Sequence, residues 1–113
     1  MLILLLALAQ AASGPVPDLE PAFRNTIVST YPDGRTARLW LEPGGTYRGQ
    51  GRRGGTTSGS WVIDGANICL SQRRPLPMPI RYCTPVMRGG VGARWSAKAV
   101  TGEPITVQLI AGR

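Results

Sequence analysis

Turn-forming residues recur along the chain at the spacing of an all-β domain, and this spacing constrains the fold more than any other feature. The turn signals PDG at 32–34, PGG at 43–45, DG at 64–65 and GEP at 102–104 each separate two runs of strand-like composition. Beyond residue 11, no stretch keeps an apolar face at the helical period. We therefore expect about eight short strands, at residues 25–30, 35–41, 45–51, 58–63, 66–71, 80–86, 93–99 and 105–110.

Strands joined mostly by tight turns form an up-and-down meander, whose two edge strands carry unpaired backbone groups. A sheet of this size hides those edges by closing into a barrel or by folding into a sandwich. The sequence therefore predicts an all-β domain over residues 25–113, an antiparallel up-and-down barrel or sandwich of about eight strands.

Side chains alternate between the two faces of a strand, so the apolar positions identify the inner face. Four aromatic side chains belong to this face, and they either fill the core or line a shallow apolar pocket: Tyr47, Trp61, Tyr82 and Trp95. Trp40 alternates to the outer face. The other side chains expected inside are Ala37, Leu39, Leu41, Ile63, Ala66, Ile68, Leu70, Ile80, Thr84, Ala97, Ala99, Ile105, Val107 and Leu109.

The chain has two cysteines, Cys69 and Cys83, and each stands between two inward-facing residues. Both sulfurs therefore point outward from neighbouring antiparallel strands, where a bridge can form. Zinc needs further ligands, yet the chain has no histidine and no third cysteine. A redox pair would favour the Cys-x-x-Cys spacing. We therefore predict a disulfide, which closes a short loop and contributes ~3 kcal/mol.

The chain begins with a short apolar run that ends in the small residues Ala9 and Ala11. This pattern predicts a signal peptide over residues 1–11, because the run is far shorter than the ~20 apolar residues of a transmembrane helix. Residues 12–24 form a Pro-rich arm, which we expect to be extended and to lie across one barrel end through Phe23. Export would place the protein in the periplasm or outside the cell, where a disulfide is stable.

The formal net charge is +7, and Lys98 is the only lysine among 13 basic residues. Such a domain attracts anionic partners. Outside the cytoplasm these are polysaccharides, lipid head groups or acidic proteins rather than nucleic acid.

Counting strands places two connections that each carry a pair of arginines at the same end of the meander. Arginine forks bind carboxylate and phosphate in bidentate fashion, so we expect a positive rim there with few nearby acids. The alternative is that these loops are merely solvated. The candidate anion-binding residues are Arg48, Arg52, Arg53, Arg73 and Arg74.

The sequence offers few candidate catalytic residues, since it has no histidine, the commonest general base. Ser58 and Ser60 have no identifiable base beside them. Most carboxylates stand in tight turns, where they have a conformational role, although Asp33 and Glu103 would share one end of a meander. We expect no enzymatic activity, no metal and no cofactor.

Several segments together resemble a group of small exported proteobacterial proteins of unassigned function: TIVSTYPDGRTARLWLEPGGTYRG, SGSWVIDGANICL, YCTPV, VGARW and ITVQLIAGR. The resemblance covers residues 25–113 and implies export and architecture alone, and the general shape is similar to lipocalin-like envelope proteins. We therefore expect an envelope protein that binds or inhibits an anionic or protein partner. The alternative is a structural envelope protein without a specific ligand.

Overall fold

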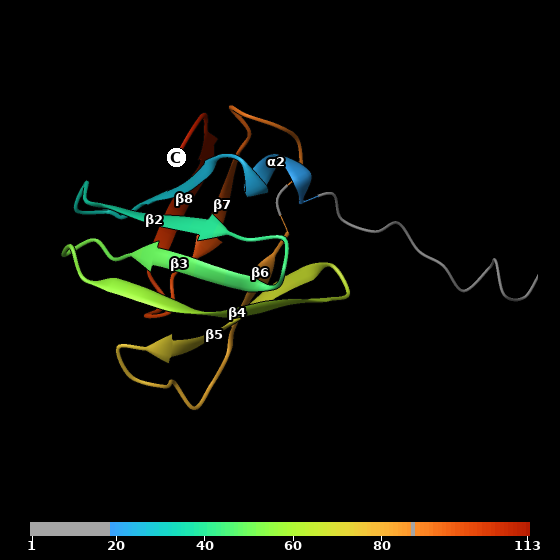
Figure 1. Ribbon diagram of the computed structural model, residues 1–113. Coiled ribbons are helices and arrows are strands. Elements are labelled where there is room, and N and C mark those ends of the chain that lie inside the picture. The colour runs from blue at the N-terminus through green and yellow to red at the C-terminus, as the bar shows by residue number, and fades with distance from the viewer. Residues whose placement is uncertain (1–18, 87) are drawn as a thin grey trace, which may run out of the picture.

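The computed structural model describes residues 19–86 and 88–113, which form a single antiparallel sheet of eight strands (Figure 1). Its strand order is β6-β5-β4-β3-β2-β1-β8-β7, so consecutive strands pair except β6 and β7, and β1 pairs with β8 as well as with β2. The prediction of an all-β meander is confirmed. The elements are α2 (Glu20–Phe23), β1 (Thr26–Thr30), β2 (Thr36–Leu41), β3 (Thr46–Gln50), β4 (Thr56–Asp64), β5 (Asn67–Arg74), β6 (Tyr82–Pro85), β7 (Arg94–Lys98) and β8 (Pro104–Ile110).

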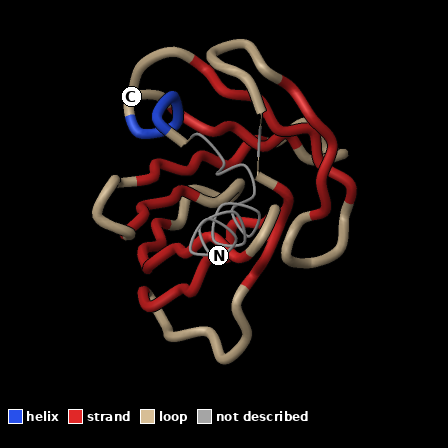
Figure 2. The backbone as a smooth tube through the Cα atoms, turned by 90° about the vertical axis from the view of Figure 1, so that its right-hand side faces the viewer, coloured by secondary structure: helices blue, strands red, loops and turns tan. Residues whose placement is uncertain are grey.

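The sheet curls into a nearly closed barrel, which decides between the two expected architectures (Figure 2). Its two edges, β6 and β7, approach each other without a ladder of backbone hydrogen bonds. The Tyr82 hydroxyl donates a hydrogen bond across this seam to the backbone carbonyl of Lys98. The strand edges that would otherwise attract other chains therefore face each other.

Glycine permits the tight turns that the sequence signals. Gly34 has a φ of 85° and Gly65 a φ of 62°, in the left-handed region where a side chain would be strained. Each lies in a hairpin connection, between β1 and β2 and between β4 and β5. These turns keep successive strands adjacent and so fix the meander.

The inner face of the barrel carries the apolar core, as the alternation predicts. Leu41 and Leu109 are fully buried, and Tyr47, Ile105 and Val107 are almost so. Ile80 and Ala66 are exceptions to the predicted inner face. Ile80 is 81% exposed, because β6 starts only at residue 82, and Ala66 is exposed, because it lies in the turn before β5 starts at residue 67.

The helix α2 covers one end of the barrel, where it lies close to the C-terminus (Figure 2). Leu19 and Ala22 are buried in the core, and the Phe23 ring lies 6.0 Å from that of Trp61. The expected arm thus covers a barrel end, but residues 20–23 are helical and not extended, since Pro21 in the first turn favours a helix. The predicted signal peptide over 1–11 and residues 12–18 of the arm lie outside the described residues. Among the described residues, no helix is long and apolar enough to span a bilayer.

The predicted disulfide between Cys69 and Cys83 is present. The two residues lie directly opposite each other on β5 and β6, on the outer face of the barrel. Cys69 is nevertheless only 1% exposed, since it stands between Cys83 and Val62 of β4 in the strand register. The bridge therefore fastens the short edge strand β6 to the rest of the sheet.

Candidate functional site

The hairpin connections alternate between the two ends of the barrel, and those opposite α2 surround a cavity. These connections span residues 31–35, 51–55, 75–81 and 99–103. The cavity has a volume of about 290 Å³, and its wall is mainly apolar. We call this the open end, and the end covered by α2 the closed end.

Arg52 is held in place at the open end and joins three of these connections. Its guanidinium donates hydrogen bonds to both carboxylate oxygens of Glu103, at 2.8 and 3.4 Å, and lies 3.8 Å from a carboxylate oxygen of Asp33. It also lies over the Tyr31 ring, 4.3 Å from the ring centre. A guanidinium with these partners is neutralised and stacked, so its main role is to tie the loops together.

The same cluster shifts two pKa values. Hydrogen bonds from the Thr101 hydroxyl and from Arg52 lower the pKa of Glu103 below its ordinary value. Burial raises the pKa of Tyr31, although the charge of Arg52 opposes this shift. Glu103 is therefore ionised at neutral pH and Tyr31 is not.

The predicted arginine rim is only partly formed. Arg52 lies in an open-end loop, and Arg53 and Arg73 are exposed without an ion pair among the described residues, but Arg48 lies in mid-strand and pairs with Glu42, whose carboxylate also binds Arg113 at the other end. The expectation of few nearby acids is wrong, because the meander places Asp33 and Glu103 in loops next to the one that carries Arg52. Arg52 is thus not available to a ligand in the way that the sequence suggested.

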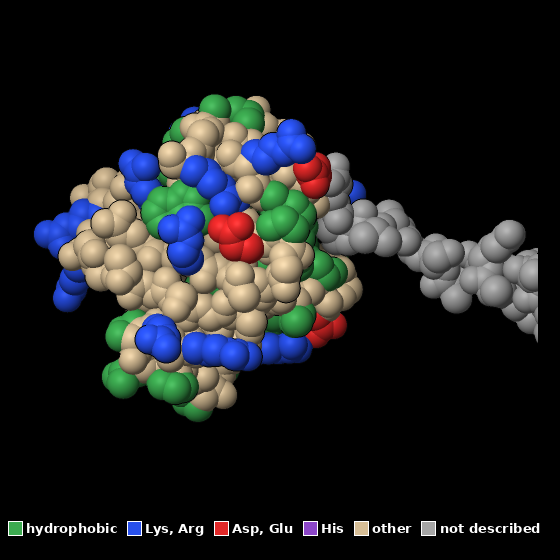
Figure 3. Space-filling view, in the orientation of Figure 1, with side chains coloured by type: hydrophobic (Ala, Val, Ile, Leu, Met, Phe, Trp, Pro, Cys, Tyr) green, Lys and Arg blue, Asp and Glu red, His purple; other side chains and the backbone are tan. Residues whose placement is uncertain are grey.

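The outer face of the sheet carries a second feature, a groove across β2, β3, β4 and β5. The strand register aligns Trp40, Arg48, Ser58 and Arg74 in one row, one residue from each strand. All four line a groove of about 350 Å³. Arg74 makes no ion pair within the described part of the chain, and positively charged side chains are spread over this face (Figure 3).

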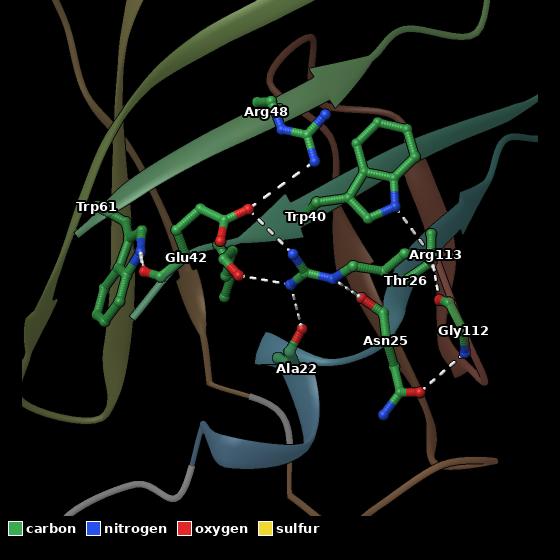
Figure 4. A network of polar contacts seen from close by, with 10 residues as sticks. Ala22, Asn25, Thr26, Trp40, Glu42, Arg48, Trp61, Gly112 and Arg113 are labelled. Carbon is green, nitrogen blue, oxygen red and sulfur yellow. Dashed lines mark hydrogen bonds and ion pairs between the residues drawn. The ribbon is translucent and has the colours of Figure 1, made fainter. Parts of the chain in front are cut away.

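Trp40 and Arg48 form a preorganised pair within this groove. The Arg48 guanidinium lies 5.5 Å from the centre of the Trp40 ring and 3.8 Å from a carboxylate oxygen of Glu42. The Trp40 indole donates a 2.9 Å hydrogen bond to the Thr26 hydroxyl, which fixes the ring on the surface (Figure 4). An aromatic face and one guanidinium group are thereby held side by side, and Arg74 lines the same groove.

Arg113 closes the other end of the barrel. Its guanidinium donates hydrogen bonds to the backbone carbonyls of Ala22 and Leu41, at 3.0 and 2.6 Å, and to the Glu42 carboxylate at 3.0 Å (Figure 4). Its Nε also reaches the carbonyl of Asn25. Because these partners come from α2, β2 and their flanking residues, Arg113 holds the helix on the barrel.

The four aromatic residues expected inside divide between cavity and core. Tyr47 and Tyr82 line the open-end cavity, and burial raises the pKa of Tyr47. Trp95 lines a smaller, deeper cavity of about 80 Å³. Trp61 lines neither of these cavities: it packs against Phe23 at the closed end, and its indole donates to the carbonyl of Glu42.

Several residues that shape the open end were not predicted from the sequence. Tyr31, Met78 and Val100 come from loops and line the cavity, and Ile80, which was expected on the inner face of a strand, lines it from a loop. A signal was present, since the segment PLPMPI at 75–80 places apolar residues in a connection that should be solvated. Because residues 75–79 connect two expected strands, they were expected to be solvated, and this signal was not used.

The described acidic side chains are engaged in pairs with arginine. Glu20 pairs with Arg24, Asp64 with Arg81, and the others belong to the Arg52 and Arg113 clusters. Within residues 19–86 and 88–113, no group of three or more His, Cys, Asp or Glu side chains is placed to hold a metal ion.

No protein-family model, curated protein or solved structure matches this chain.

Proposed function

We propose that the protein is an exported binding module of the bacterial envelope, located in the periplasm or outside the cell, which recognises an anionic polymer through its outer-face groove. The observation that carries this proposal is the row of Trp40, Arg48, Ser58 and Arg74. The disulfide is compatible with an oxidising compartment.

The chemistry of the groove suits carboxylate or phosphate groups on an extended chain. Two guanidinium groups can each hold an anionic group in bidentate fashion, and Arg74 has no competing acid among the described residues. Ser58 lies between the two arginines in the register and offers a hydroxyl donor. Trp40 adds an apolar face beside them. A sugar ring can stack on this face, whereas a small inorganic anion makes no use of it.

A non-catalytic role agrees with the state of the acidic side chains. General acid and base catalysis needs a carboxyl group that is free to exchange protons with a substrate. The described carboxylates are instead paired with arginines, and Arg52 and Arg113 among these also tie separate segments of the barrel together. A structural envelope protein without a specific ligand is the alternative, and the experiment below separates the two.

The test compares two double variants of equal charge in the full chain. R48Q/R74Q removes the groove arginines, whereas R24Q/R94Q removes two exposed arginines elsewhere. Binding to a polyuronate and to inorganic polyphosphate is measured by co-sedimentation or calorimetry, so that the two arms distinguish carboxylate from phosphate. We expect R48Q/R74Q to abolish binding and R24Q/R94Q to retain most of it.

Salt should weaken the interaction, because the Debye length falls from about 10 Å at 0.1 M to about 3 Å at 1 M. Stability should change by no more than about 1 kcal/mol in either variant, since exposed ion pairs contribute little. Equal loss of binding in both variants would mean that net charge alone attracts the polymer. No binding by the unaltered protein to either polymer would favour the structural alternative.

A further inference from the structure

The interior of the barrel is hollow from the open end toward its middle. The open-end cavity of about 290 Å³ is close to the lower limit of ~300 Å³ for small-molecule pockets. A second cavity of about 80 Å³ adjoins it, and the two share the lining residues Ser29, Leu39, Leu70, Tyr82 and Ile105. An elongated ligand that enters at the open end would therefore find a mainly apolar wall.

The lip of this hollow is unusually apolar for a solvent-exposed surface. Met78, Ile80 and Val100 are 48%, 81% and 69% exposed, and all three line the cavity. Hydrophobic side chains also gather at the lower edge of Figure 3, where the β5–β6 loop lies. An exposed apolar patch continuous with a pocket marks a binding site more often than chance exposure does.

Two exposed arginines lie close in sequence to residues that line the open-end cavity. Arg53 and Arg73 are exposed and form no ion pair among the described residues. Each is a near neighbour in sequence of a residue that lines the cavity, Gly51 and Gln72 respectively. The two acids of the open end are balanced by two other arginines, since Arg52 pairs with Glu103 and Asp33 and Arg35 also pairs with Asp33.

We propose that the open end binds an amphiphile that has one alkyl chain and one anionic head group. The chain enters the barrel past the apolar lip, and the head group remains at the surface near Arg53 and Arg73. This site is separate from the outer-face groove. R48Q/R74Q should therefore leave amphiphile binding unchanged, and the two proposals fail or succeed independently.

The first test is the dependence of affinity on chain length. Straight-chain alkanoates from hexanoate to tetradecanoate are titrated below their micelle concentrations, with calorimetry or the intrinsic tryptophan fluorescence, to which Trp95 contributes, as the signal. Each added methylene should tighten binding about fourfold until the chain fills the hollow. An affinity that does not depend on chain length would overturn the proposal, since it would indicate attraction by charge alone.

The second test blocks the hollow. Ala37 lines the open-end cavity, so A37F should fill it and weaken dodecanoate binding by about tenfold or more. A66F makes the same change at an exposed turn of the closed end and should bind normally. If A37F does not fold, I80S carries the test, because Ile80 is an exposed lip residue whose replacement should weaken binding without affecting the core. Unchanged binding by the folded blocking variant would refute the site.

The third test concerns the head group. R53Q/R73Q should weaken dodecanoate and dodecyl phosphate binding roughly fivefold and leave dodecanol binding unchanged. Dodecylammonium should bind more weakly than dodecanoate to the unaltered protein. Equal binding of the anionic and cationic probes would disprove the role of the two arginines, even if the chain-length result held.

Discussion

Replacing Arg113 with methionine should detach α2 from the closed end of the barrel. The substitution keeps a long apolar stem and removes the guanidinium, which is only partly exposed at 24%. It leaves the carbonyl oxygen of Leu41 without its donor and that of Ala22 with only the 3.4 Å bond from the Asn25 amide, and both residues are 1% exposed. A hydrogen bond to a charged group contributes about 1.5–3 kcal/mol, and the contacts of one guanidinium are not additive. We therefore expect a loss of about 3 kcal/mol in the free energy of unfolding.

For a domain of this size, 1 kcal/mol shifts the melting temperature by about 4–8 °C, so the expected decrease is roughly 15 °C. Thermal and urea unfolding, followed by circular dichroism, measure it. Hydrogen exchange of the backbone amides in α2 should also accelerate, since the helix loses its main polar anchor.

The matched control is R24M, which makes the same chemical change. Arg24 is 79% exposed and pairs with Glu20, four residues earlier. Removing this exposed ion pair should lower the free energy of unfolding by no more than about 0.5 kcal/mol. If R113M and R24M have the same stability within about 0.5 kcal/mol, then the buried carbonyls find water in place of Arg113. The reasoning about the closed end would then be wrong.

Three further outcomes are expected. The double variant C69A/C83A should lose about 3 kcal/mol in the free energy of unfolding measured with urea, because the bridge joins two residues that are 14 positions apart. The backbone amides of β6 should then exchange faster than those of the other strands. The lowered pKa of Glu103 means that its contribution to stability is complete above the ordinary value of 4.5 and is lost as the pH falls below it; E103Q should therefore flatten the acid limb of a stability–pH profile. G59A should destabilise by about 3 kcal/mol or prevent folding, since its Cβ would lie 2.0 Å from a backbone oxygen of β5. G44A meets open space and should be neutral in the same melting assay.

The order and approximate bounds of all eight strands follow from the sequence, because turn residues and alternation are local signals. The PDG and DG turns place glycine where φ is positive, and the apolar residues of β8 alternate as the burial of Ile105, Val107 and Leu109 shows. The disulfide was also predictable, because both cysteines alternate to the outer face of consecutive strands. The error at Ile80 has the same local origin: a strand-like composition there continued across a loop that prolines interrupt.

Only the tertiary structure decided which arginines are free. Arg52 and Arg53 are neighbours in sequence, yet Arg52 pairs with Glu103, 51 residues away, while Arg53 does not. Arg113 likewise meets Leu41 and Ala22 only because α2 covers a barrel end. The row of residues in the groove depends on register across four strands.

The sequence by itself determined a disulfide-bridged antiparallel meander, since each of its signals spans one turn or one strand. Barrel closure, the hollow interior and the pairing of charges were decided by contacts between segments far apart in the chain. Such contacts depend on sheet curvature and register, and the period-two pattern carries no information about either. A local pattern tells which side of a strand faces inward, but not whether the space that it faces is filled.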